Sequence, residues 1–288
     1  MRTRYTTALI TLFGIALALP VSAARLPVSA SHLAAEREFT LPAQAVEVAS
    51  NVFSLGSATD PATGKVVEGF ALVHPKRGYH HRPGHAGGPG GPGGGESSCF
   101  AYLARGAKWK SAEPWVMNPS NGDLLDVNEV FDVQVAAIAE WEDAGDGVLG
   151  NEIGTNIFEE GLFAPESDLS ADTVTPDTLN EVYFGSIAEP NAIAVTIVWG
   201  IFGGPPAARE LIEWDQVYDE VDFSWSLTGE AGKMDFENIA QHELGHALGL
   251  GHPSDSCTEE TMFRFASEGE TTKRDLNAGD IAGVNGLY

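Results

Sequence analysis

The segment from residue 242 to residue 252 reads His-Glu-Leu-Gly-His-Ala-Leu-Gly-Leu-Gly-His. In the spacing H-E-x-x-H-x-x-G-x-x-H, His242, His246 and His252 can hold one zinc ion, and the Glu243 carboxylate can act on a water that the zinc activates. Three neutral imidazoles leave a fourth position for water, as in catalytic zinc sites, whereas structural sites are usually closed by four protein ligands. The spacing therefore predicts hydrolytic zinc chemistry, with Glu243 as the general base.

A helix followed by a sharp turn must position these side chains. His242 and His246 are four residues apart and therefore share one helix face. Asp235 is placed to cap the start of this helix. Gly249 can take the left-handed conformation that ends the helix and returns His252 to the same ion. Apolar residues repeat near the helical period along this segment: Phe236, Ile239, Ala240, Leu244, Ala247 and Leu248.

At these residues the chain resembles the metzincin metalloproteases and, within them, the matrixins. Metzincins have a methionine turn below the zinc, and Met262 lies ten residues after His252. Residues 276–288 resemble the last helix of a matrixin catalytic domain, and residues 108–119 resemble its first strand. The resemblance implies an α+β, zincin-like catalytic domain with a mixed twisted sheet, a long back helix, an active-site helix and a C-terminal helix. Met262 would then pack beneath the zinc site as a structural residue and would not bind the ion.

Three departures from the family pattern narrow this expectation. The position two residues after Met262 is Arg264, so the tyrosine ligand of astacins and serralysins is not expected. No histidine occurs between His85 and His242, so the second, structural zinc site of matrixins is not expected either. The Pro-Arg-Cys-Gly motif of matrixin prodomains is missing.

The chain has two cysteines, Cys99 and Cys257. In an oxidising compartment we expect them to form a disulfide that joins the entry of the catalytic domain to the loop beside the zinc. An alternative is a latency role, with the Cys99 thiolate bound to the zinc. A bridge requires the two Cα atoms to lie within about 7 Å.

The N-terminus, residues 1–23, predicts a secretory signal peptide. Arg2 and Arg4 precede an apolar run over residues 8–19 that is too short to span a bilayer, and residues 21–23 form a small-x-small cleavage site. The alternative is an uncleaved anchor. No later stretch is long and apolar enough to cross a membrane, so we expect a secreted product, extracellular or periplasmic, without stable membrane insertion.

The excess of acidic residues restricts the classes of partner that the protein can bind. Forty-one acidic residues against sixteen lysines and arginines give a formal charge of −25, which argues against nucleic-acid binding. The length suits one catalytic domain with an N-terminal extension, expected to be a monomer. Calcium is an additional option because acidic residues are abundant, although no D-x-D-x-D-G loop occurs.

Before the catalytic domain, expected over residues 99–288, the sequence predicts two segments. Residues 24–73 form an N-terminal extension, in which 52–55 and 66–73 predict a β-hairpin. This hairpin is either a remnant propeptide or an integral part of the sheet. Residues 74–98 are rich in histidine, glycine and proline and predict a flexible linker, or a metal-capturing tract with His80, His81 and His85.

Within the catalytic domain, residues 127–143 predict a long helix with Asp126 as its cap. Residues 180–185, 192–199 and 211–218 predict strands, of which the second is nearly all apolar and should be buried. The third alternates and should lie at or near an edge. Asp215 in this strand and Asp219 directly after it favour a solvated acidic face over a calcium site.

These patterns together predict a secreted zinc-dependent endopeptidase acting on proteins or peptides. An extended substrate would pair with an exposed strand edge above the zinc. One alternative is a secreted, zinc-stabilised binding protein without protease activity, although Glu243 is present. Others are a metal-scavenging protein that uses the histidine tract, and a non-peptide amide hydrolase.

Overall fold

The computed structural model describes residues 37–78 and 99–288. The expected signal peptide and the histidines at 80, 81 and 85 lie outside the described residues, so the expectations for them stay predictions. Within the described residues, no helix has the length and apolar character needed to cross a membrane.

A nine-stranded sheet forms the centre of the fold, with the strand order β2-β3-β4-β9-β10-β8-β6-β7 and β1 paired to β8. Its strands are β1 Glu38–Phe39, β2 Val46–Ala49, β3 Val52–Thr59, β4 Val66–Pro75, β6 Val116–Asn118, β7 Leu162–Phe163, β8 Glu181–Ile187, β9 Ala192–Ile201 and β10 Glu210–Asp219. The side with β7, β6, β8 and β10 is parallel, and β9, β4, β3 and β2 continue it in antiparallel order. The predicted mixed sheet is therefore confirmed.

The predicted N-terminal hairpin exists as β3 and β4, and it is an integral part of this sheet. The Asp60 carboxylate accepts hydrogen bonds from the backbone N–H groups of Ala62 and Thr63, which fixes the turn between the two strands. On its other side, β4 pairs with β9 from Glu68 to Pro75. Both edges of β9 are consequently occupied, by β4 and by β10.

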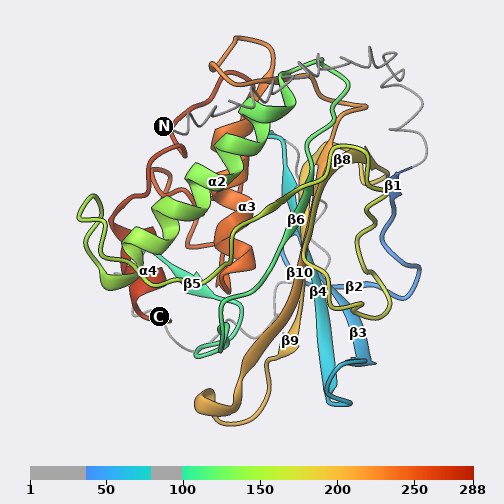
Figure 1. The fold of residues 1–288 in the computed structure, drawn as a ribbon, viewed down its shortest axis with the longest axis vertical. Coiled ribbons are helices and arrows are strands. Elements are labelled where there is room, and N and C mark those ends of the chain that lie inside the picture. The colour runs from blue at the N-terminus through green and yellow to red at the C-terminus, as the bar shows by residue number, and fades with distance from the viewer. Residues whose placement is uncertain (1–36, 79–98) are drawn as a thin grey trace, which may run out of the picture.

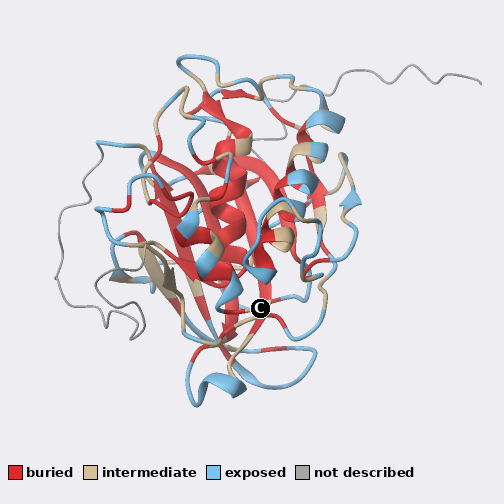
Figure 2. Ribbon diagram, turned by 90° about the vertical axis from the view of Figure 1, so that its left-hand side faces the viewer, coloured by how far each residue is buried: buried red, intermediate tan, exposed pale blue. Residues whose placement is uncertain are grey.

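The helices lie on one face of the sheet (Figure 1). They are α2 Val127–Asp143, α3 Phe236–Ala247 and α4 Ala278–Asn285, with short 3₁₀ turns η1 Ala144–Asp146 and η2 Pro206–Ala208. As predicted, Asp126 caps α2, accepting from the N–H groups of Asn128 and Glu129. Trp141 of α2 is fully buried, and its indole N–H donates to the Gln241 carbonyl of α3 at 2.9 Å. Figure 2 shows the buried strands behind these helices. The α+β, metzincin-like class is confirmed.

The prediction that residues 211–218 form an edge strand is wrong. β10 lies between β9 and β8, and nearly all of its residues are buried. Its polar residues are structural acceptors: Asp215 accepts from the N–H groups of Asp172 at 2.9 Å and Glu181 at 3.2 Å. Asp219 likewise accepts from the Val221 N–H at 2.7 Å. The expected solvated acidic face is therefore also wrong, whereas β9 is buried as predicted.

Candidate active site

Helix α3 presents His242, Glu243 and His246 toward the sheet. Asp235 caps the helix by accepting from the Asn238 N–H at 3.1 Å, as its sequence position predicts. The helix ends at Ala247, and Gly249 has φ +99°, a conformation that favours glycine. The turn leads into β13 Leu250–Gly251, which pairs with β5 Ala101–Tyr102 and is followed directly by His252.

The structure brings the three predicted histidines together. The Nε2 atom of His252 lies 3.3 Å from Nε2 of His242 and 3.1 Å from Nε2 of His246. Nδ1 of His242 is 2.7 Å from the Thr261 carbonyl oxygen, and Nδ1 of His246 is 2.9 Å from the Leu250 carbonyl oxygen. A carbonyl oxygen only accepts, so in both rings Nδ1 carries the proton and Nε2 offers a lone pair.

This donor set fits a zinc ion. Zinc–nitrogen bonds of about 2.0–2.1 Å in tetrahedral geometry place two ligand nitrogens roughly 3.3 Å apart, which agrees with the observed separations. Lone pairs that face one another at such distances repel unless a cation lies between them. Burial lowers the pKa of His242, His246 and His252, which favours the neutral imidazoles that bind metal.

Glu243 is completely buried beside the histidines. The Thr196 hydroxyl of β9 donates to its Oε2 at 2.6 Å, and Nδ1 of His74 at the end of β4 lies 2.9 Å from its Oε1. Burial raises the pKa of Glu243 to about 8, against the opposing effect of the Thr196 hydrogen bond. The carboxyl group is thus held at both oxygens by residues of the sheet.

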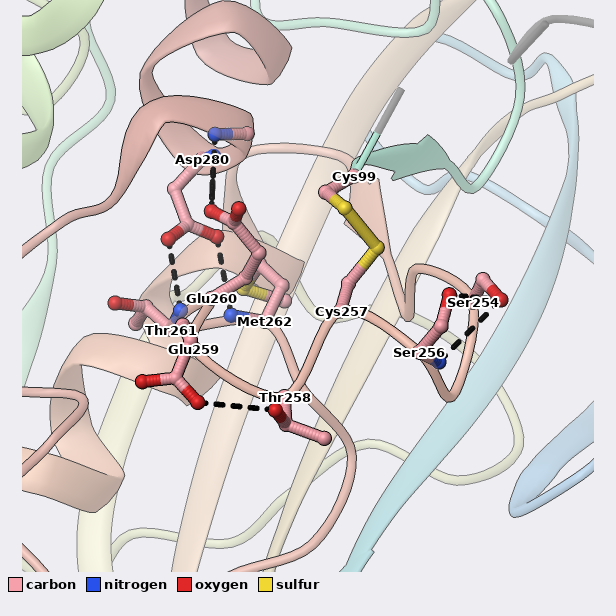
Figure 3. The surroundings of a disulfide bond; sticks show 11 residues. Cys99, Ser254, Ser256, Cys257, Thr258, Glu259, Glu260, Thr261, Met262 and Asp280 are labelled. Atoms are coloured by element: carbon pink, nitrogen blue, oxygen red, sulfur yellow. Dashed lines mark hydrogen bonds between the residues drawn. A yellow bond between two sulfur atoms is a disulfide. The ribbon is translucent and has the colours of Figure 1, made fainter. Parts of the chain in front are cut away.

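Cys99 and Cys257 form a disulfide with a Cα–Cα distance of 5.5 Å, within the limit expected for a bridge (Figure 3). Cys99 lies just before β5, and Cys257 follows His252 by five residues. The bridge and the β5–β13 pair therefore tie the segment that carries the third histidine to the start of the domain. Since both sulfurs are in the disulfide, the alternative Cys99 thiolate on zinc does not occur in this structure.

The predicted methionine turn lies under α3. A Cβ placed on Gly245 would come within 2.1 Å of the Met262 sulfur, so the glycine lets the methionine pack directly against α3. Asp280 of α4 fixes this turn by accepting from the N–H groups of Thr261 at 2.7 Å and Met262 at 3.1 Å (Figure 3). The Thr261 carbonyl in turn orients His242.

Three residues of the site were not identified from the sequence. Asp280 had a detectable signal, because Asn277 and Asp280 have capping-box spacing at the start of a helix. Thr196 and His74 had none, since their role depends on which strands pair beside α3. His74 was assigned to the beginning of the histidine-rich segment and not to the site.

The C-terminal part of the chain, residues 164–288, matches the family model for matrixins. Metalloendoproteinase 1-MMP from Arabidopsis thaliana is 45% identical over 56 residues, which is 19% of this chain and 14% of that protein. Metalloendoproteinase 2-MMP from the same plant is 34% identical over 87 residues, 29% of this chain and 21% of the relative. Human matrilysin is 36% identical over 74 residues, 26% of each chain.

The matched segments thus span 14% to 26% of the length of these three relatives. The region matched by the family model includes the strands β8 to β10, the helix α3 with its three histidines, the methionine turn and α4. Over residues 164–288, which carry the histidine triad and the methionine turn, the chain is similar to the matrixins among the metzincins.

Proposed function

We propose that the protein is a secreted, monomeric, zinc-dependent endopeptidase that hydrolyses peptide bonds with Glu243 as general base. The observation that carries this proposal is the convergence of three Nε2 atoms beside one buried carboxyl group, whose Oε2 accepts a hydrogen bond from Thr196. The matrixin relatives support the same activity class.

Zinc bound to His242, His246 and His252 would supply Lewis acidity, lowering the pKa of water and polarising the scissile carbonyl. The residues of the protein orient the imidazole ligands and transfer the proton. Glu243 accepts a proton from the attacking water and passes it to the leaving amine. Burial makes the carboxylate a stronger base than an exposed glutamate, and a zinc cation bound beside it would favour its ionised form. The backbone carbonyls of Thr261 and Leu250 keep the two helical imidazoles in the ligating tautomer.

A peptide-mixture assay tests the proposal. The purified protein is incubated with a mixture of defined peptides, with and without a zinc chelator, and the products are identified by mass spectrometry. The N-terminus of the active species is sequenced in parallel. We expect internal peptide-bond cleavage that chelation abolishes and zinc restores. Cleavage that survives complete zinc removal would contradict the proposal.

Two alternatives have weaker support. A zinc-stabilised binding protein has no requirement for Glu243, yet this carboxyl group is buried and held by two side chains. The metal-scavenging alternative depends on His80, His81 and His85, which lie outside the described residues.

Calcium is a second ion that the protein is proposed to bind, at Asp172, Asp177 and Glu213. These residues offer oxygens within 4.8 Å of one another. Glu213 is fully buried, and its Oε1 has no hydrogen-bond partner among the described residues. Burial raises the pKa of Glu213 to about 9, so a cation must compete with a proton for this carboxyl group at neutral pH.

The pH dependence of stability tests this site. Because the folded state holds a proton that unfolded Glu213 would release, stability should fall between about pH 4.5 and 9, by up to about 1.4 kcal/mol per pH unit. Millimolar calcium should raise the melting temperature most at alkaline pH. Glu213→Gln should remove this calcium effect and lessen the pH dependence, to which Glu243 and Glu181 also contribute because burial raises their pKa values. Asp222→Asn, a change to an acidic residue outside the cluster, is the control. An equal response to calcium in Glu213→Gln would refute the site.

A further inference from the structure

The end of β4 contacts the proposed catalytic carboxyl group, that of Glu243, through the side chain of His74. His74 is completely buried, with Nδ1 at 2.9 Å from Glu243 Oε1 and its ring centroid 3.9 Å from that of His242. Its Nε2 has no hydrogen-bond partner among the described residues. A side chain in this position fills the space next to Glu243 that a scissile peptide group must enter.

The backbone after His74 is bound on both sides, as an extended substrate would be. On one side, β4 runs antiparallel to β9, with His74 opposite Ala194, and the Lys76 N–H donates to the Asn191 carbonyl at 2.9 Å. On the other side, Lys76 forms a parallel bridge with Ala266, and the Arg77 N–H donates to the Ala266 carbonyl at 2.7 Å. Residues 74–77 therefore lie between β9 and the segment after the methionine turn.

Two ion pairs hold this stretch at its outer end. Lys76 Nζ lies 2.7 Å from Glu268 Oε1, and an Arg77 guanidinium nitrogen lies 3.8 Å from Glu270 Oε2. Both basic side chains are more than one-third exposed. Exposed ion pairs contribute little to stability, so these two contacts add little to the cost of separating this end.

The body of β4 behaves differently. Val67, Ala71 and Val73 are buried in one cluster with Val195 and Trp199 of β9. That packing anchors the strand up to residue 73. Beyond it, His74 and Pro75 are buried outside this cluster, and Lys76 and Arg77 form ion pairs and lie over the rings of Phe223 and Phe263. Local opening of the end of β4 therefore requires no loss of the hairpin core.

We propose that residues 74–77, the blocking segment, are an intramolecular occupant of the peptide-binding track and limit hydrolysis to the fraction of molecules in which they have left it. This inference rests on the proposed function and specifies its regulation. The occupant also defines the substrate direction, antiparallel to β9 and parallel to the segment at Ala266. The apparent kcat/KM is then proportional to the fraction of molecules whose blocking segment is open.

Two variants of the full-length, zinc-loaded protein open the segment in different ways. Lys76→Glu with Arg77→Glu turns both ion pairs into repulsive contacts and leaves His74 in place. His74→Ala removes the side chain from Glu243. The control is Lys65→Glu, which breaks a comparable exposed ion pair, Lys65–Glu210 at 2.8 Å, at the other end of β4.

Three readouts are compared: peptide hydrolysis, equilibrium binding of a short peptide hydroxamate that chelates zinc, and hydrogen exchange of the Arg77 amide in the zinc-free protein. Both opening variants should raise kcat/KM and tighten hydroxamate binding by about tenfold, since the open fraction multiplies both. The Arg77 amide should exchange faster in both, and Lys65→Glu should match the wild type.

The outcomes separate the inference from the proposed function. Tighter hydroxamate binding and faster Arg77 exchange without hydrolysis in any variant would support the blocking segment and contradict the endopeptidase. Unchanged hydroxamate binding in both opening variants would overturn the blocking segment. A lower kcat in His74→Ala with unchanged hydroxamate binding would likewise overturn it and make His74 a positioning residue for Glu243.

Discussion

Glu243→Gln is expected to lower peptide hydrolysis by about 10²–10⁴-fold, the usual contribution of a general base. Glutamine has nearly the same shape and can still accept the Thr196 hydrogen bond, but it cannot take a proton from water. The histidine ligands are untouched, so zinc content should remain at the wild-type level.

The measurement pairs kcat/KM on one cleavable peptide with zinc stoichiometry from metal analysis of the same sample. Glu237→Gln is the matched control, because this glutamate lies in the same helix, is partly exposed and pairs with Arg274 at 3.1 Å, away from the histidines. Wild-type hydrolysis in Glu243→Gln would show that another group accepts the proton.

The second large effect is expected for His246→Ala. Removing one of three ligands leaves two imidazoles, and the variant should lose its bound zinc and its hydrolysis together. A ligand that binds only the folded state stabilises it by about 4 kcal/mol when present at 1,000 times its dissociation constant. We therefore expect zinc to raise the melting temperature of the wild type and to leave that of His246→Ala unchanged.

Differential scanning calorimetry with and without zinc provides this comparison. The control is a triple substitution of His80, His81 and His85 by alanine, which alters the histidine tract and preserves the triad. It should keep both the zinc-dependent stabilisation and the hydrolysis. If the tract variant lost zinc uptake while His246→Ala retained it, the metal-scavenging function would be favoured.

The zinc helix was predictable because its information is local. Cap, helical period, ligand spacing and terminal glycine all lie between Asp235 and His252, so the spacing determines their relative geometry. The same applies to α2 with its Asp126 cap and to the hairpin of β3 and β4. In each case the interacting residues are close in sequence.

The edge assignment of β10 failed because acidic residues are normally exposed, and the periodicity of one strand contains no information about its neighbours. Asp215 is buried because the backbone N–H groups of Asp172 and Glu181, more than thirty residues away, require an acceptor. The contact of His74 with Glu243 spans 169 residues and depends on the register of β4 against β9. No local pattern specifies such a register.

The most direct test of the central claim is a zinc back-titration of the stripped protein, with peptide cleavage followed at each addition. It is performed on the wild type and on the Lys76→Glu, Arg77→Glu protein, so that a closed blocking segment does not mask the chemistry. Cleavage should rise in proportion to bound zinc and reach its maximum at one ion bound by the histidine triad. Cleavage by the zinc-free protein at the rate of the zinc-loaded protein would contradict the account.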